Sequence, residues 1–391
     1  MLLMYLEFRK ETVNGASISM NTFRTKMKQR FCFIAVILLV CGCTREAHKK
    51  NGIIVREASG IARVENNLLL VGDDADGRYF IFPLENRNGP IIPISPETVE
   101  EVVLPHAELA LDLEGIDRLA DGRVVVLSEQ LHCLIAEKTI GSNTYGVIAE
   151  YDRTVIEFGN RGLEGIGVKA MPNGASRIAV LWEGGYLLHT MMPVQLQEYV
   201  RRIPLKPVVI VHEIEQGQTV GIVDQPLRYI ELNVPEPDGI PPLAQRFRAT
   251  DLVWHRWREE DESGVLEEGL IVLLSSENSP PESTGVAIRY TTKILQRFNL
   301  EGNPVGDPLH INHLCKTCLH ELIEDHSAGI SPRMMAHLEE VAAILDQGNW
   351  ENINWEGLDW FEPGESLITI YDKWPKDPPF ALVIDIPEEW K

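Results

Sequence analysis

The chain beyond residue 56 alternates short runs of aliphatic residues with turns that often contain Asp-Gly, and a small motif precedes most of the runs. The motif is a polar or acidic residue, usually followed by Gly, and then an aliphatic residue. Runs rich in Val, Ile and Leu bounded by such turns are typical of β-strands. A unit of short strands that recurs about every 50 residues is typical of a propeller blade. The motif begins at Ser59, Glu114, Glu164, Asp251 and Glu356.

This pattern predicts an all-β protein that folds as one β-propeller over residues 57–386, because a single blade cannot bury both faces of its sheet alone. Six blades are favoured and five to seven are allowed, since two intervals between motifs can each hold another blade or an insertion. One helix is expected near residues 331–348. Ser331 stands as an N-cap before Pro332, and apolar residues follow at helical spacing as far as Leu345. The helix either covers one mouth of the ring or packs on its side.

The N-terminal segment has a different pattern. Four basic residues between positions 24 and 30 precede an uncharged apolar run over residues 31–42. A basic region followed by about 12 apolar residues is typical of an export signal, and the run is shorter than the roughly 20 residues of a transmembrane helix. It ends in Val40-Cys41-Gly42-Cys43, which resembles a bacterial lipobox and implies cleavage before Cys43 and a lipid on its thiol. The alternative is an uncleaved anchor.

These features predict three parts: a signal peptide over residues 1–42, a tether over 43–56 and the propeller beyond it. Translation of the signal starts at Met1, Met20 or Met27. Thr44 follows the cysteine where an Asp would favour retention in the inner membrane. We therefore expect the protein in the cell envelope, held in the outer membrane by the acyl anchor on Cys43 and facing the periplasm.

The charge balance narrows the choice of partners. The chain has 58 Asp and Glu against 36 Lys and Arg, a net charge of −22. A nucleic-acid-binding protein needs a basic face to meet the phosphates, so nucleic acid is not expected as a partner. An acidic surface instead favours the collection of divalent cations.

The acidic residues of the motif are candidate ligands. The first strand of each blade lines the channel of a propeller, so Glu114, Glu164, Asp251 and Glu356 are predicted to form a ring. Carboxylates held close together repel one another unless a cation or hydrogen-bond donors intervene, and hard oxygen ligands suit Ca²⁺ best. Alternatively, each carboxylate accepts backbone N–H groups of the neighbouring blade and holds the ring together.

A second acidic set ends the strands that follow the motif. Antiparallel pairing places these ends at the same mouth of the ring as the motif, which makes that mouth the candidate functional surface. Three basic residues are candidates for holding a phosphate there: Arg161, Arg248 and Lys373, with Arg78 as a weaker one. The second acidic set consists of Asp73, Asp74, Glu129, Glu183, Glu277 and Asp372.

Three cysteines remain beyond the signal and the lipid site: Cys133, Cys315 and Cys318. In an oxidising compartment, a local disulfide between Cys315 and Cys318 is a candidate. The alternative is a Zn²⁺ site, in which these two cysteines act together with nearby histidines. The histidines are His310, His313, His320 and His326.

The motifs fall in the order seen in a known family. Asp112-Leu113-Glu114-Gly115-Ile116, Leu163-Glu164-Gly165-Ile166, the Thr250-Asp251-Leu252 unit and Trp355-Glu356-Gly357-Leu358 resemble those of phytase-like proteins, the family described as having "esterase-like activity of phytase". The resemblance covers about residues 57–386. It implies a propeller fold, and it implies that the acidic mouth carries the site.

Two functions are compatible with these observations. The first is a lipid-anchored, phytase-like hydrolase of phosphoesters or other esters, in which Ca²⁺ at the acidic mouth polarises the ester oxygen and positions water. The second is a non-catalytic propeller that binds a glycan, a peptide or a partner protein, with a purely structural glutamate ring. The sequence assigns no catalytic residue.

Overall fold

A computed structural model describes most of the compact unit Ile53–Lys391, which is distinct from the unit Met1–Gly52. The predicted signal, Cys43 and the tether lie outside the described residues, as do Asp73, Asp74, Arg161, His326 and Lys373. The described ranges are 58–72, 77–84, 89–94, 98–104, 112–140, 142, 144–151, 162–183, 206–223, 226–234, 245–258, 266–278, 289–324, 330–347, 354–372 and 379–391.

Each of the first three blades is an antiparallel sheet of four strands that follow one another from the channel outwards. Blade 1 contains β1 (Ala58–Val64), β2 (Asn67–Gly72), β3 (Arg78–Pro83) and β5 (Glu100–Val103). Blade 2 contains β6 (Leu113–Arg118), β7 (Val124–Ser128), β8 (Cys133–Glu137) and β9 (Tyr145–Glu150), and the short β13 (Gly221–Ile222) adds to its edge in parallel. Blade 3 contains β10 (Leu163–Ala170), β11 (Ser176–Trp182), β12 (Val208–Ile214) and β14 (Arg228–Glu231).

The last two blades complete the ring. Blade 4 has the longest strands: β15 (Gln245–Arg258), β16 (Leu266–Asn278), β17 (Arg289–Asn299) and β18 (Pro304–His310). Blade 5 contains β19 (Asn354–Glu362), β20 (Ser366–Asp372) and β21 (Phe380–Asp385), and its outer strand is β4 (Ile91–Pro93) from the early part of the chain. Ile92 of β4 pairs with Ala381, so early and late segments of the chain join in one sheet and close the ring.

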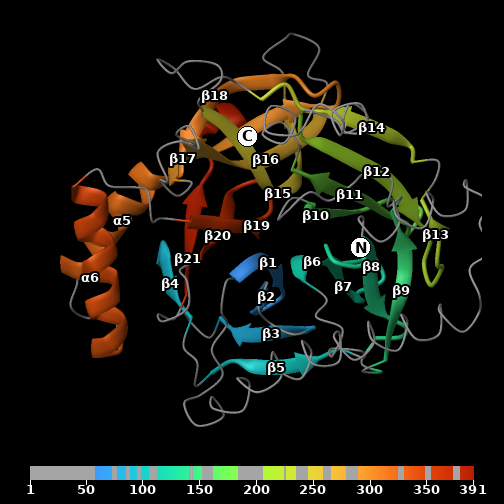
Figure 1. Ribbon diagram of the computed structural model, residues 1–391, viewed down its shortest axis with the longest axis horizontal. Helices are drawn as coiled ribbons and strands as arrows, with labels where there is room; N and C mark the ends of the chain where they lie inside the picture. The colour runs from blue at the N-terminus through green and yellow to red at the C-terminus, as the bar shows by residue number, and fades with distance from the viewer. Residues whose placement is uncertain are drawn as a thin grey trace, which may run out of the picture. The chain divides into compact units, whose positions relative to one another are not determined.

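The innermost strands β1, β6, β10, β15 and β19 contact one another in turn, and β19 returns to β1 (Figure 1). This arrangement confirms the β-propeller, with five blades rather than the favoured six. The long interval after Glu164 holds β12 and β14 of blade 3 together with β13, which joins blade 2. The interval before Glu356 holds the long strands of blade 4 and two helices. Neither interval adds a blade.

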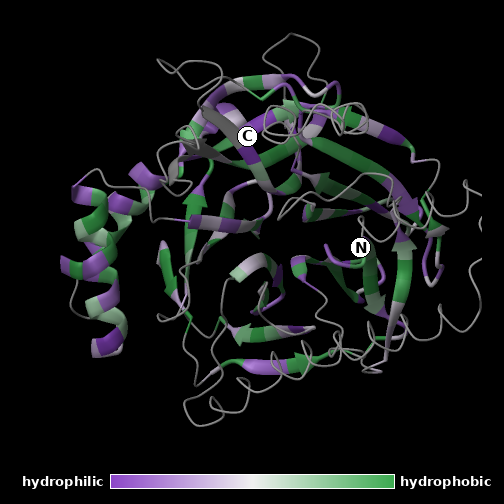
Figure 2. Cartoon of the chain, in the orientation of Figure 1, coloured by the Kyte–Doolittle hydropathy of each residue, from purple (hydrophilic) through white to green (hydrophobic). Residues whose placement is uncertain are grey.

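The second strand of each blade contains a long apolar run because neighbouring blades cover both of its faces. All seven residues of β11 except Arg177 are buried, and β11 is mostly hydrophobic in Figure 2. Apolar side chains of blades 3 and 4, among them Leu181, Leu252 and Leu270, form one cluster between the two sheets. This explains why these strands read as continuous apolar runs rather than as an alternation.

Two helices, α5 (Ile311–Glu324) and α6 (Pro332–Asp346), lie between blades 4 and 5 where the sequence predicted one. The predicted cap is present, since Ser331 Oγ accepts the Met334 N–H at 3.3 Å. The helices contact each other and pack on the side of the ring, next to β4, β17 and β21 (Figure 1). Leu338 of α6 shares a buried cluster with Trp355 and Phe380 of blade 5. No helix in the described part of the chain is long and apolar enough to span a membrane.

Cys315 and Cys318 are free thiols on α5, so the expected disulfide is not formed. Residues three apart on a helix have Cβ atoms about 5–6 Å apart, whereas a disulfide needs about 3.5–4.5 Å. Burial raises the pKa of the Cys315 thiol well above its ordinary value and keeps it protonated. Among the described residues, the one group of side chains close enough to hold a metal ion lies elsewhere, so the alternative Zn²⁺ set does not assemble there either.

Candidate functional site

Each inner strand carries a β-bulge at the repeated motif. A bulge leaves one residue unpaired and aims its side chain out of the regular alternation. The residue after the bulge is Gly165 in blade 3 and Asp251 in blade 4. Thr250 therefore takes the position in blade 4 that Glu164 takes in blade 3. The sequence pattern had aligned Asp251 with Glu164, but Asp251 lies one residue after that position. The bulged residues are Ser59, Glu114, Glu164, Thr250 and Gly357.

The motif contains glycine because neighbouring inner strands nearly touch there. A Cβ on Gly115 would lie 2.8 Å from Cγ2 of Ile166, and a Cβ on Gly165 would lie 2.6 Å from Cα of Asp251. In both cases the motif of one blade contacts the motif of the next blade. The inner strands therefore run side by side in the same direction. Their first residues therefore meet at one end of the channel.

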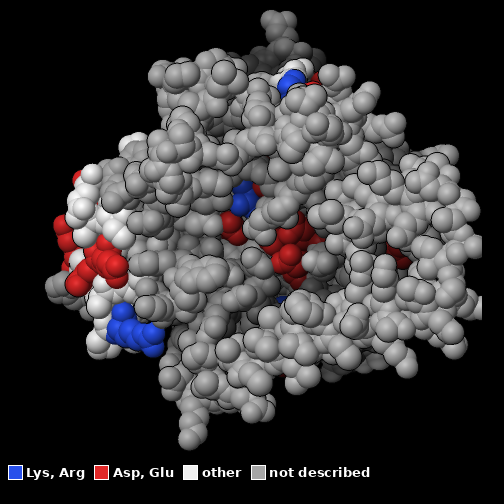
Figure 3. Space-filling model, viewed as in Figure 1, with Lys and Arg blue, Asp and Glu red and all other residues white. Residues whose placement is uncertain are grey.

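This end of the channel, which we call the acidic mouth, also receives the last residues of the second strands, because those strands are antiparallel to the first. In Figure 3 the hollow at the centre of the ring holds acidic side chains with basic ones beside them. Asp372 ends the second strand of blade 5 at the same end, and Glu277 stands one residue before the end of that strand in blade 4. The other described members of the acidic mouth are Asp112, Glu114, Glu129, Glu164, Glu183, Arg248 and Glu356.

Blade 2 brings three carboxylates together. One ligand oxygen from each of Asp112, Glu114 and Glu129 lies within 4.8 Å of the other two. Asp112 directly precedes β6 with a φ of 49°, and its carbonyl accepts the Glu129 N–H at 2.8 Å, which joins the start of β6 to the end of β7. The sequence analysis did not single out Asp112. Its position two residues before Glu114, and so on the same face of a strand, was the available signal.

Blade 3 has a different charge arrangement around the equivalent glutamates. Arg248 of β15 donates from Nη2 to Glu164 Oε2 at 2.7 Å, and its Nε contacts Glu183 Oε2. Burial raises the pKa of Glu164, the Arg248 charge opposes the rise, and the charge of Glu356 adds to it. Asp112, Gly162 and Arg248 each stand four residues before the aliphatic residue of their motif, so the blades differ in charge at this one position.

A buried lysine completes the mouth at the junction of blades 4 and 5. Lys293 of β17 is 1% exposed; its Nζ donates to Asn354 Oδ1 at 2.5 Å and to Ser275 Oγ. The amide of Asn354 in turn donates from Nδ2 to Glu356 Oε1 at 2.6 Å. Lys293 was missed because a single lysine in a strand is usually solvated. The predicted phosphate candidate Arg78 lies elsewhere, paired with Glu101 in the outer half of blade 1.

Three aspartates deeper in the channel join the blades, which is the role that the alternative interpretation gave to the glutamate ring. Each carboxylate accepts the N–H of the next residue in its own strand through one oxygen and an N–H of a neighbouring blade through the other. We call Asp117, Asp251 and Asp359 the central aspartates. Their acceptor bonds across blades are Asp117 to Val168 N, Asp251 to Leu358 N and Asp359 to Arg63 N, each 2.6 Å long.

The central aspartates resist ionisation. Burial raises the pKa of Asp359 to about 7 and raises the pKa values of Asp117 and Asp251 well above their ordinary value. The backbone N–H groups lower these pKa values, and the Asp359 charge raises those of Asp117 and Asp251 further. The desolvation of the charged form outweighs two hydrogen bonds per carboxylate.

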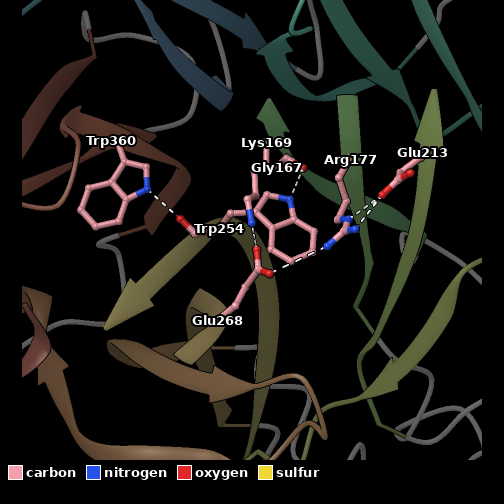
Figure 4. Close-up of polar contacts among 7 residues, drawn as sticks. All are labelled: Gly167, Lys169, Arg177, Glu213, Trp254, Glu268 and Trp360. Atoms are coloured by element: carbon pink, nitrogen blue, oxygen red, sulfur yellow. Dashed lines mark hydrogen bonds and ion pairs between the residues drawn. The ribbon is translucent and has the colours of Figure 1, made fainter. Parts of the chain in front are cut away.

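The opposite end of the channel is joined by a network of indoles and ion pairs (Figure 4). Trp254 Nε1 donates to the Gly167 carbonyl at 3.0 Å, and Trp360 Nε1 donates to the Trp254 carbonyl at 2.8 Å, so blades 3, 4 and 5 are linked in sequence. Glu268 lies between Lys169 and Arg177 and pairs with both. The polar and charged groups of this network are paired with one another, which is typical of a structural role.

No family model matches the chain, and none of the curated proteins matches its sequence, so membership of the phytase-like family stays a prediction. Among solved structures, virginiamycin B lyase from Staphylococcus aureus is similar with 9% identity and a TM-score of 0.32, covering 84% of this chain and 95% of that one. XC5397 from Xanthomonas campestris, described as a gluconolactonase, has 9% identity and a TM-score of 0.32 over 86% and 87%. YCF48 from Cyanidioschyzon merolae has 7% identity and a TM-score of 0.32 over 87% and 71%. At these values the similarities carry no information on activity.

Proposed function

We propose that the acidic mouth binds Ca²⁺ through Asp112, Glu114 and Glu129, and that the protein hydrolyses phosphoesters or other esters there, as its phytase-like motifs suggest. The observation that carries this proposal is the convergence of three carboxylate oxygens within 4.8 Å. Calcium–oxygen bonds are about 2.3–2.6 Å long, so two ligands on opposite sides of one ion are separated by at most about 5 Å. The three oxygens therefore fit around a single ion.

The donor set favours calcium over other ions. All three donors are carboxylate oxygens, which suits a hard cation, and no described histidine or cysteine belongs to the group. Three side chains leave positions for water and substrate, because Ca²⁺ takes six to eight ligands. A bound cation would polarise the ester oxygen and lower the pKa of water.

With a cation bound, two basic residues of the mouth could meet an anionic substrate. Arg248 and Lys293, both from blade 4, place positive charge on the side of the mouth away from blade 2. Such groups stabilise the negative charge of a phosphate or of a developing oxyanion. The central aspartates hold the strands that position these groups.

An activity screen tests the proposed hydrolysis. A phosphomonoester and a carboxylic ester, each assayed with Ca²⁺ and with a chelator, should show activity that the chelator abolishes. Glu114→Gln keeps the shape of a ligand and removes its charge, and it should lower kcat/KM by on the order of 100-fold. Glu268→Gln at the opposite end of the channel is the control and should keep the parent activity. Calcium binding without hydrolysis of any ester would favour the non-catalytic alternative.

We also propose that the protein is anchored through a lipid on Cys43 in the outer membrane and faces the periplasm. The support is the charge step, the apolar run and the small residue before the cysteine in the N-terminal segment. Cys43→Ala should release the protein from the membrane fraction of cells and prevent labelling by a radioactive fatty acid. Membrane retention equal to that of the parent would contradict the anchor.

A further inference from the structure

Glu356 differs in its surroundings from the other glutamates of the repeated motif. Glu164 is paired with Arg248, and Glu114 belongs to the group of three carboxylates. Glu356 is half-buried and belongs neither to that group nor to an ion pair in the described part of the chain. Its Oε1 accepts Nδ2 of Asn354 at 2.6 Å, whereas its Oε2 has no hydrogen-bond partner among the described residues. One oxygen of this carboxylate is therefore held, and the other is left for a ligand.

Lys293 determines how the amide of Asn354 is turned. An ammonium group only donates hydrogen bonds, so the amide has to direct its oxygen at Lys293 and its NH₂ group at Glu356. The structure has this arrangement: Lys293 Nζ donates to Asn354 Oδ1 at 2.5 Å, and Asn354 Nδ2 donates to Glu356 Oε1. The negative end of the amide dipole thus meets the cation, and its positive end meets the carboxylate. A donor in this position favours the ionised form of a carboxylate.

The three residues bring a positive charge of blade 4 to a carboxylate of blade 5. Asn354 and Glu356 are two residues apart at the start of β19, so their side chains lie on the same face of the strand at the acidic mouth. The bulge at Gly357 follows directly. Lys293 itself is 1% exposed, so it acts on a ligand in the mouth through Asn354 and Glu356 rather than by contact.

We propose that Glu356 is the general base of the site and that Lys293 and Asn354 position it, an inference that rests on the proposed function. Glu356 takes a proton from the attacking water through Oε2 while the water oxygen bonds to the acyl carbon or the phosphorus atom. The bond to the leaving oxygen breaks, and that oxygen takes the proton from Glu356. One ester and one water thus give one alcohol and one acid, and Glu356 ends ionised as it began.

Variants of Glu356 test the base on an ester that the parent hydrolyses. Glu356→Gln keeps the shape of the side chain and should lower kcat by about 100-fold or more, with little change in KM. Glu356→Ala should lose as much and regain activity in formate, because a small carboxylate can enter the space that the side chain leaves. Glu356→Gln leaves no such space and should not respond to formate. Glu268→Ala, at the opposite end of the channel, is the control and should keep the parent kcat with and without formate.

Calcium binding distinguishes a base from a metal ligand. Because Glu356 is not one of the three carboxylates of the proposed calcium site, Glu356→Gln should show the same rise in melting temperature with Ca²⁺ as the parent. Glu114→Gln should lose that rise. This measurement needs no substrate, and it also shows whether each variant is folded.

Asn354→Asp tests the positioning of the base. The change keeps the size of the side chain and an acceptor for Lys293, but it places a second carboxylate where Glu356 had a donor. Because a neighbouring negative charge makes a carboxylate hold its proton more readily, the fall of kcat at low pH should move to higher pH. At neutral pH, kcat should fall by about 10-fold. Asn303→Asp, the same change at an exposed residue of blade 4, should leave the pH profile as it is in the parent.

The outcomes separate this inference from the proposed function. A Glu356→Gln variant that keeps the parent kcat, or one whose melting temperature no longer responds to Ca²⁺, would overturn the role of Glu356 as base and leave the proposed function in place. An unchanged pH profile in Asn354→Asp would overturn the positioning role. A parent protein that binds Ca²⁺ but hydrolyses no ester would contradict the proposed function, and the base would be contradicted with it.

Discussion

Gly165→Ala is expected to destabilise the protein by about 4 kcal/mol or more and to leave little of it folded in cells. The new Cβ would lie 2.3 Å from Oδ1 and 2.6 Å from Cα of Asp251. Neither atom can move away cheaply, because Cα is backbone and the carboxylate is held by the N–H groups of Leu252 at 2.8 Å and Leu358 at 2.6 Å. Blades 3 and 4 would have to separate, which opens the ring. Urea unfolding followed by circular dichroism measures the change.

Gly146→Ala is the matched control. Gly146 also lies in a strand, β9 of blade 2, but a Cβ there would meet only the flexible side chain of Lys138, whose Cε is 3.0 Å away. The change should therefore alter the free energy of unfolding by less than about 1 kcal/mol. Equal effects of the two substitutions would show that the close approach of the inner strands does not determine stability.

The second large effect concerns pH. Between about pH 4 and pH 7, the central aspartates are expected to lower stability as pH rises, because their folded pKa values lie above the ordinary value of 3.8, with that of Asp359 at about 7. The folded chain then holds protons that the unfolded chain has released, which costs up to about 1.4 kcal/mol per pH unit for each group. For Asp359, this contribution to stability is fully present below about pH 4 and is lost as pH passes about 7.

The comparison of the parent with Asp359→Asn isolates this effect. Burial lowers the pKa values of His212 and His255 to about 4, which acts in the opposite direction over a similar range and hides the aspartates in the parent curve alone. These histidines are unchanged in the variant, so the difference between the two unfolding free energies should vary with pH between about 4 and 7 and be constant above that. Chemical denaturation at a series of pH values measures it. Parallel curves would contradict the raised pKa of Asp359.

Much of the fold could be predicted from sequence because each blade repeats the same motif, followed by apolar strands and short turns. The apolar runs identified the strands, and the Glu-Gly-aliphatic motif marked the start of each blade at the channel. The blade count was not predictable, because β4 crosses from blade 1 to blade 5 and β13 adds to blade 2. Such pairings depend on contacts between distant segments and leave no local pattern. The helix α5 was missed for a different reason: its histidines and cysteines suggested a ligand cluster rather than a helix.

The candidate site was predictable as a location but not in its roles. The motif glutamates do meet at one mouth, yet Glu114 belongs to a group of three carboxylates and Glu164 is paired with Arg248. That difference arises two residues before the bulge, at the position of Asp112 in blade 2 and of Arg248 in blade 4. This position lies outside the repeated motif, so a comparison of the motifs does not include it. The joining of the blades falls to Asp117, Asp251 and Asp359, because their oxygens meet backbone N–H groups across the strand gap.

Calcium-dependent thermal unfolding of the mature domain tests the central claim most directly. A ligand at 100 times its Kd adds about 2.7 kcal/mol to the free energy of unfolding, so the parent should melt at a clearly higher temperature in Ca²⁺ than in chelator. Glu114→Gln should lose this shift, while Glu268→Gln and Glu183→Gln should keep it. A parent protein whose melting temperature is the same in Ca²⁺ and in chelator, or a shift that Glu114→Gln leaves unchanged, would contradict a calcium site at Asp112, Glu114 and Glu129.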